Sequence, residues 1–180
     1  MAVIMAMTLP AIQSVRESAR MTYCRSNLAQ LGEAFHAYHQ MHGSLPSGSV
    51  DTRSPVEANP DRFAWGWALQ LLPQLGEQNR AAALDPALGV FTPANSVVLD
   101  SPPAYMICPS SNSQTRIGYA GCHNDQLAPI QVENNGLLTL NSHVRHEDLI
   151  DGLHQSLLLG EAVDVDDADR PGRGHHRVRL

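Results

Sequence analysis

The segment from Ala11 to His42 constrains this chain more than any other feature, because it contains no proline and a single glycine, Gly32. Its apolar residues recur at helical spacing: Ile12, Val15 and Ala19, continued by Cys24, Leu28, Leu31, Phe35 and Tyr38. Charged and amide side chains fill most of the other side, and Gly43 with Pro46 supplies a stop. The pattern predicts one long amphipathic helix, which on periodicity alone could be a surface helix of any α+β protein.

Short elements separated by turn residues follow this helix. Residues 44–61, rich in Pro, Ser, Gly and Asn, are expected to form a loop. A second helical pattern covers Trp65–Leu84, where Pro73 should divide it into two short helices. Later apolar runs are interpreted as strands: Gly89–Phe91, Val97–Leu99, Tyr105–Ile107, Arg116–Ala120, Leu137–Leu140 and Ser156–Leu159. We therefore predict an α+β fold in which the long N-terminal helix packs on a small antiparallel β-sheet with large loops.

Charge and composition exclude several classes of function. The chain has 12 basic and 18 acidic residues and a net charge of −6, so nucleic acid is not an expected partner. Every basic residue is arginine, which removes Schiff-base and phosphate-loop lysine chemistry. No G-x-S-x-G elbow is present, and the adjacent Cys122 and His123 would point to opposite faces of a strand. We expect no enzymatic activity, no catalytic residue and no cofactor.

The histidines and cysteines give only weak indications of a metal site or a disulfide. The nine histidines include the pairs His36–His39 and His143–His146, but no zinc framework surrounds them, so they are interpreted as structural and no metal site is predicted. The cysteines are Cys24, Cys108 and Cys122. This odd number allows one disulfide and one free thiol, and residue spacing leaves the pairing open.

The apolar run Met1–Leu9, which ends at Pro10, is too short to cross a bilayer, since a spanning helix needs about 20 apolar residues. It also lacks the basic start and the cleavage site of a signal peptide. Two interpretations stay open. The run is either a buried helix start or the C-terminal half of an apolar segment that begins upstream of Met1.

Several sequence words, in order along the chain, carry a family resemblance. They are L-P-A-I-Q-S-V-R-E-S-A-R (Leu9–Arg20), C-R-S-N-L-A-Q-L-G-E-A-F-H-A-Y-H (Cys24–His39), W-A-L-Q-L-L-P-Q-L-G-E-Q (Trp67–Gln78), I-C-P-S (Ile107–Ser110), Y-A-G (Tyr119–Gly121), N-G-L-L (Asn135–Leu138) and N-S-H-V-R-H-E-D-L-I-D-G-L-H-Q-S-L-L-L-G-E (Asn141–Glu161). Together they resemble the pseudopilin-like bacterial family known as domain of unknown function fifteen-fifty-nine, which also carries a solute-binding heading.

The resemblance implies an architecture like that of type IV pilins and secretion pseudopilins, with assembly through the first helix. Pro10 would mark a bend, and the residues expected to contact like helices or secretion-system proteins are Ile12, Val15, Ala19 and Leu28. The implied location is the inner membrane, facing the periplasm or cell surface, if an upstream apolar segment exists; a chain that truly starts at Met1 would be soluble. Cys24 and Cys108 lie in family-like words and are the pair expected to form a disulfide.

The chain departs from the family pattern at both ends. It lacks the prepilin-type processing site, and a charged sequence after Glu161 replaces the usual last strand. We therefore expect residues 1–10 to be a remnant of an apolar membrane-helix segment and residues 11–161 to form the pilin-like domain. Residues 162–180 are expected to be a mobile charged tail, so that the last strand is missing.

The family's solute-binding heading suggests a rival function, an extracytoplasmic module that binds a glycan or another solute. Its candidate site consists of Trp65, Trp67, His123, Asn124 and Asp125, because aromatic faces can stack on sugars and the loop residues supply polar groups. Both tryptophans are also consistent with core positions of a helix.

Overall fold

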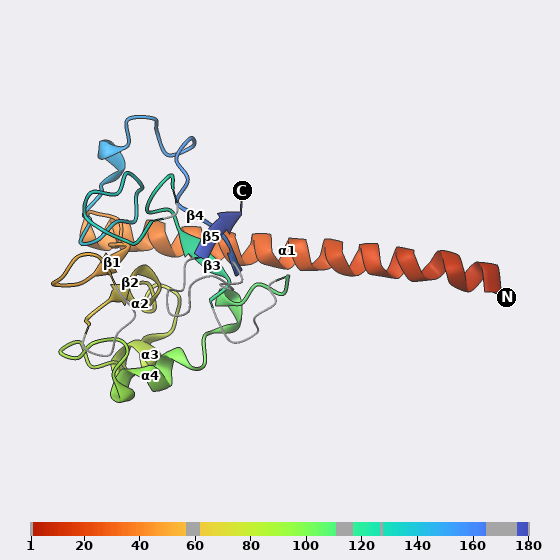
Figure 1. Cartoon of the computed structure of the whole chain (residues 1–180), viewed down its shortest axis with the longest axis horizontal. Coiled ribbons are helices and arrows are strands. Elements are labelled where there is room, and N and C mark those ends of the chain that lie inside the picture. The colour runs from red at the N-terminus through yellow and green to blue at the C-terminus, as the bar shows by residue number, and fades with distance from the viewer. Residues whose placement is uncertain (1, 57–61, 111–116, 127, 165–175, 180) are drawn as a thin grey trace.

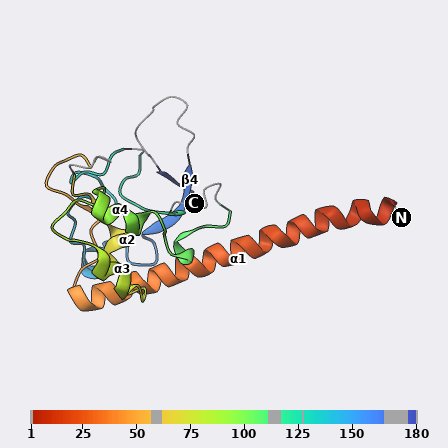
Figure 2. The ribbon, with the colours of Figure 1, turned by 90° about the horizontal axis from the view of Figure 1, so that it is seen from below.

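The computed structural model describes residues 2–56, 62–110, 117–126, 128–164 and 176–179, and its dominant feature is the helix α1 (Ala2–His42). Figure 1 shows α1 as a rod that crosses the domain and extends far beyond it toward the N-terminus, and Figure 2 shows the same projection from below. The predicted helix over 11–42 is confirmed. It begins earlier than predicted and continues through Pro10 without interruption.

Burial divides α1 into two parts. The side chains of residues 11–23 are exposed, whereas Cys24, Leu31 and Phe35 are buried in the core. Gly43, with a φ of 74°, ends the helix in the left-handed conformation that glycine adopts without strain, and its N–H donates to the His39 carbonyl at 2.8 Å.

The remaining elements are short. They are β1 (Ser49–Val50), β2 (Trp65–Gly66), α2 (Trp67–Gln70), α3 (Gln78–Ala83), α4 (Pro93–Leu99), the 3₁₀ turn η1 (Ala104–Met106), β3 (Tyr119–Gly121), the 3₁₀ turn η2 (His146–Asp148), β4 (Leu159–Asp164) and β5 (His176–Arg179). The second helical pattern is split as predicted, with Pro73 between α2 and α3.

Two small antiparallel sheets complete the α+β fold. One pairs β1 with β2, and the other has the order β3-β4-β5. In the second sheet Tyr119 lies opposite Glu161 and Ala162 lies opposite Val178. The predicted fold class is confirmed. Figure 1 shows this sheet beside α1, near the place where the rod leaves the domain.

The expectation that the last strand is missing is wrong. Strand β4 continues to Asp164, and β5 pairs with it through four residues, beginning at His176 opposite Asp164. A backbone ladder can form whatever the charge of the side chains, and β4 continues to Asp164, well past Leu159, where the predicted strand ended. The expected mobile tail, residues 162–180, therefore contains strand residues at both ends; residues 165–175 and 180 lie outside the described part of the chain.

Several other predicted strands are also wrong. Val97–Leu99 belongs to α4, which begins at Pro93, a favoured first residue of a helix. Tyr105 lies in η1, and Leu137–Leu140 contributes an isolated bridge from Leu140 to Ser49 rather than a strand. Apolar runs of three or four residues do not distinguish a strand from a helical turn.

The core lies between α1 and the segments folded over it. Phe35 and Trp67 pack with ring centroids 5.5 Å apart, and Leu71, Tyr119 and Leu138 join the same cluster. The backbone of Gly48 runs close to the Leu138 segment: a Cβ at Gly48 would lie 1.7 Å from the Leu138 carbonyl oxygen. Only glycine permits this approach.

Candidate functional site

The projecting part of α1 presents apolar side chains that the domain does not cover. Ile12 is 52% exposed and Val15 is 68% exposed, and Met21 and Tyr23 are also exposed. A shallow hollow on this surface is lined by Val15, Ser18, Ala19, Thr22, Tyr23 and Ser26. We call this surface, residues 11–23 of α1, the rod surface.

The rod surface contains three of the residues expected to contact other helices, Ile12, Val15 and Ala19. Leu28 differs, because it is half-buried and packs against the core of its own domain. Leu28 therefore helps to attach α1 to the domain, and its expected contact with other helices stays a prediction. Pro10 lies within the continuous helix just before the rod surface.

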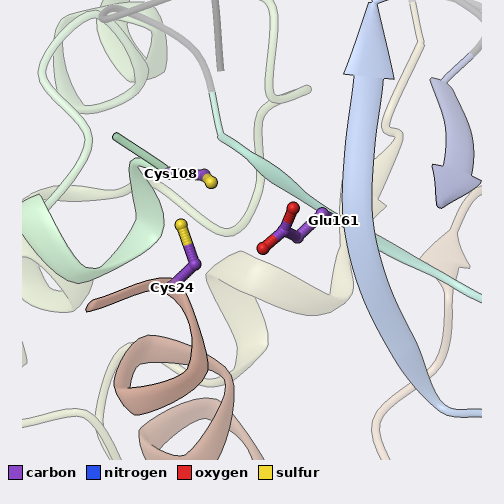
Figure 3. A group of neighbouring side chains, drawn as sticks. All are labelled: Cys24, Cys108 and Glu161. Carbon is purple, nitrogen blue, oxygen red and sulfur yellow. The ribbon is translucent and has the colours of Figure 1, made fainter. Parts of the chain in front are cut away.

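A second cluster lies in the interior, where Cys24, Cys108 and Glu161 meet (Figure 3). Cys24 is on α1, Cys108 follows η1, and Glu161 is on β4. Their sulfur and carboxylate atoms all lie within 4.8 Å of one another. Both cysteines are buried free thiols. The structure thus brings the expected pair together, and the disulfide itself stays a prediction.

Hydrogen bonds and close packing of neighbouring residues hold the two cysteines in place. The Gly118 N–H donates to the Met106 carbonyl at 2.7 Å, and a Cβ at Gly118 would lie 2.7 Å from the Cys108 Cβ. The Asn27 amide donates to the Ile107 carbonyl at 3.3 Å, and the Tyr119 hydroxyl donates to the Cys24 carbonyl at 3.5 Å. Helix α1, the Cys108 loop and β3 are therefore joined around the two thiols.

Burial controls the acidity of the cluster. It raises the pKa of the Cys108 thiol to about 11, and a hydrogen bond with Cys24 adds to the shift. Burial likewise raises the pKa of Tyr119. At neutral pH Cys108 is therefore a protonated thiol, which is a poorer nucleophile than a thiolate.

The third cysteine, Cys122, is half-buried and separate from this cluster. Burial raises the pKa of Cys122, and the negative charge of Asp125 raises it further.

Residues of the rival ligand site contact other residues of the same domain. Trp67 is buried against Phe35, and the indole N–H of half-buried Trp65 donates to the Leu88 carbonyl at 3.1 Å. The His123 ring nitrogen Nε2 lies 2.8 Å from the Ala128 carbonyl oxygen.

The polar loop of that rival site is closed by internal hydrogen bonds. The Asn135 N–H donates to the Asn124 side-chain oxygen at 3.5 Å, and the Asp125 N–H donates to the Asn135 side-chain oxygen at 3.0 Å. These contacts engage the Asn124 side chain and the Asp125 backbone, and a solute-binding role for the loop stays a prediction.

Sequence reasoning missed two groupings. Glu161 has no role in the sequence analysis beyond ending a family-like word, although the register of β3 and β4 places it beside the thiols. His146 was not connected with His36 and His39, yet its ring stacks on that of His39 with centroids 3.6 Å apart. Local sequence spacing carries no signal for either contact, because each joins segments far apart in the chain.

The fold and the rod surface define a class of protein: an α+β domain carried on an N-terminal helix that projects beyond it. The chain belongs to the family described as "Protein of unknown function (DUF1559)", SBP_bac_10, which matches residues 13–179. This confirms the family that the sequence words indicated. No curated protein matches the chain, and no solved structure does. Within the described residues, no helix has both the length and the apolar character needed to span a membrane.

Proposed function

We propose that this chain is a non-enzymatic structural subunit, similar to pseudopilins, that assembles through the rod surface of α1. One observation carries the proposal. A single helix extends well beyond the domain that it supports and exposes apolar side chains, Ile12 and Val15, along the extension. An extension of this kind has few partners within its own chain, so its apolar side chains are available for contacts with another helix.

The composition of the rod surface suits helix packing. Ser18, Ala19 and Thr22 are small, so the ridge of a neighbouring helix can approach the hollow that they line together with Val15. Burial of apolar surface there would contribute about 25 cal/mol per Å² removed from water. The same small side chains allow close backbone approach in apolar surroundings.

The expected partners are other pilin-like helices or secretion-system proteins. The proposed location is the inner membrane, with the domain facing the periplasm or the cell surface. Fractionation of cells that produce the protein from its native locus tests this placement. Recovery with the inner membrane supports it, and recovery in the cytoplasmic fraction contradicts it.

Self-association in solution tests the assembly proposal directly. Sedimentation velocity of the full chain should show association that increases with concentration. Val15→Glu places a charge on the rod surface, where two helices would pack. The dissociation constant for self-association should rise at least tenfold, because an unpaired charge is costly to bury.

Ile150→Glu is the matched control, since Ile150 is an apolar residue that is 100% exposed but lies in a loop of the domain. This variant should associate like the unchanged protein. A full chain that stays monomeric at high concentration, or an equal loss of association in both variants, would contradict assembly through the rod surface.

A further inference from the structure

The interior cluster of Cys24, Cys108 and Glu161 offers three metal-ligand atoms from three separate parts of the chain. The two sulfurs come from α1 and from the loop after η1, and the carboxylate comes from β4. Thiolate ligands select metals such as zinc and copper(I), whereas carboxylate ligands suit harder cations. A mixed set of two thiolates and one carboxylate fits Zn²⁺, which accepts sulfur, nitrogen and oxygen ligands.

The distances are compatible with a tetrahedral metal. Zinc bonds of about 2.3 Å to sulfur and about 2.0–2.2 Å to oxygen place neighbouring ligand atoms roughly 3.3–3.8 Å apart. The three atoms of the cluster already lie within 4.8 Å of one another. Closing the set therefore requires a shift of at most about 1 Å, which rotation about side-chain bonds can supply.

The carboxylate distinguishes a metal site from a simple disulfide. Glu161 points toward both sulfurs (Figure 3), so its carboxylate and the two thiols face one another. A disulfide would use the two sulfurs alone and would not engage the carboxylate beside them. A cation would engage all three groups and balance most of their negative charge.

We propose that Cys24, Cys108 and Glu161 form a Zn²⁺-binding site in the reduced protein, with the fourth coordination position open to water. Binding forms two Zn–S bonds and one Zn–O bond and releases the two thiol protons to solvent. No electron is transferred. None of its ligands belongs to the rod surface, so the site does not depend on assembly through α1. It does require Cys24 and Cys108 to be thiols, and it is therefore an alternative to the disulfide that the family resemblance implies.

The position of the site suggests what the metal would do. Cys24 is the first buried side chain after the exposed residues 11–23 of α1. A metal at this point would tie the helix to the Cys108 loop and to β4 at the junction where the rod leaves the domain. It would therefore stiffen the junction between rod and domain as well as the domain itself.

The test uses the full chain, stripped of metal and kept reduced with a phosphine, and titrated with Co²⁺ as a spectroscopic substitute for Zn²⁺. A sulfur-to-cobalt charge-transfer band should grow to saturation at one equivalent, together with the strong visible bands of tetrahedral cobalt. Added Zn²⁺ should abolish both. In weak buffer, Zn²⁺ should release two protons per chain.

Variants assign the ligands. Cys24→Ser and Cys108→Ser should each reduce the charge-transfer intensity to about half and weaken binding at least 100-fold. Glu161→Gln should retain both sulfur ligands and weaken binding at least tenfold. Cys122→Ser is the matched control, because Cys122 lies outside the cluster, and it should bind like the unchanged protein. Far-ultraviolet circular dichroism shows whether each variant keeps the helix.

Three results would overturn the site. The first is no charge-transfer band in the folded, reduced protein. The second is a band that Cys122→Ser removes. The third is metal binding in Glu161→Gln that equals that of the unchanged protein, because the carboxylate would then not be a ligand.

Discussion

At the scale of single residues, a buried ion pair anchors the loop after β1. The Arg62 guanidinium donates from Nε to the Asp51 carboxylate at 2.9 Å, and the two side chains are only 7% and 0% exposed. Arg62 also donates through Nη2 to the carbonyls of Arg53 and Pro55. The Asn141 side chain also binds Asp51: its Oδ1 accepts from the Asp51 N–H, and its Nδ2 donates to the Asp51 carbonyl. One guanidinium therefore binds three residues of the segment 51–55.

The pKa of Asp51 reflects this arrangement. Burial raises it, but hydrogen bonds from Arg62 and the Arg53 backbone, together with the charge of Arg62, outweigh burial and hold the pKa below its ordinary value. A carboxyl whose pKa is depressed by folding contributes stability above its unfolded pKa of about 4. That contribution is lost as the pH falls through the folded pKa.

Arg62→Met should lower the free energy of unfolding at pH 7 by about 3–5 kcal/mol, because it leaves a buried carboxylate without its partner. The cost should shrink as the pH falls from neutral toward the depressed folded pKa of Asp51, because protonation removes the unpaired buried charge in the variant and the ion pair in the unchanged protein. Urea unfolding at a series of pH values measures both effects. Arg145→Met is the control, since the ion pairs of Arg145 are exposed, and it should stay close to the unchanged protein. A cost that does not depend on pH would contradict this account.

At the scale of elements, three histidine rings join η2 to the end of α1. The rings of His39 and His146 are stacked at 3.6 Å with an angle of 4°, and His36 lies 5.0 Å from His146. The backbone N–H of His146 donates to Nε2 of the His39 ring at 3.3 Å. Burial lowers the pKa of His146, and the neighbouring His39 and His36 lower it further.

This contact should weaken in acid. A histidine whose pKa is depressed by folding contributes stability that is complete above its unfolded pKa of about 6.5 and is lost as the pH falls through the folded value. His146→Phe keeps an aromatic ring but cannot take up a proton. Its free energy of unfolding should therefore fall less than that of the unchanged protein between pH 7 and pH 5 in urea unfolding experiments.

His154→Phe is the matched control for this element, because His154 is exposed in the loop that follows η2. It should keep the full acid sensitivity of the unchanged protein. Identical pH profiles for His146→Phe and the unchanged protein would show that the stack has no role in that sensitivity.

The elements also show what a sequence of this kind can predict. The helix over 11–42 was predictable because its apolar spacing persists over many turns, and burial of Leu31 and Phe35 follows directly from that spacing. The strands were poorly predictable because β3 has three residues and β1 has two, too few to establish a period of two.

The candidate sites divide in the same way. The periodicity of one helix places Ile12 and Val15 on an apolar stripe, and the family resemblance supplies their expected role in helix contacts. The meeting of Glu161 with Cys24 depends on how β4 pairs with β3 and where that sheet lies on α1, which no local pattern encodes. The resemblance of sequence words supplied the pairing of Cys24 with Cys108, but it gave no sign of the carboxylate.

At the scale of the whole molecule, a rod and a domain share one helix but are stabilised differently. Beyond Cys24 the helix is held by the core, through Leu31 and Phe35. Before Cys24, the domain reaches the exposed residues 11–23 through a hydrogen bond from Ser110 to Glu17 at 3.5 Å. Helices without tertiary packing are marginally stable in water, so the rod depends on its own backbone hydrogen bonds until another surface covers it.

Hydrogen exchange of the full chain should reveal this division. In dilute solution the amides of residues 11–22 should exchange many times faster than those of residues 28–38, because the first group opens by local fraying and the second opens only when the core does. Raising the protein concentration should slow exchange in the rod alone, since association buries the side chains around Val15. Val15→Glu should keep the rod fast at every concentration while leaving the core amides unchanged. Equal protection along the whole of α1 in dilute solution would contradict the division, because the rod would then be as stable alone as when it is covered.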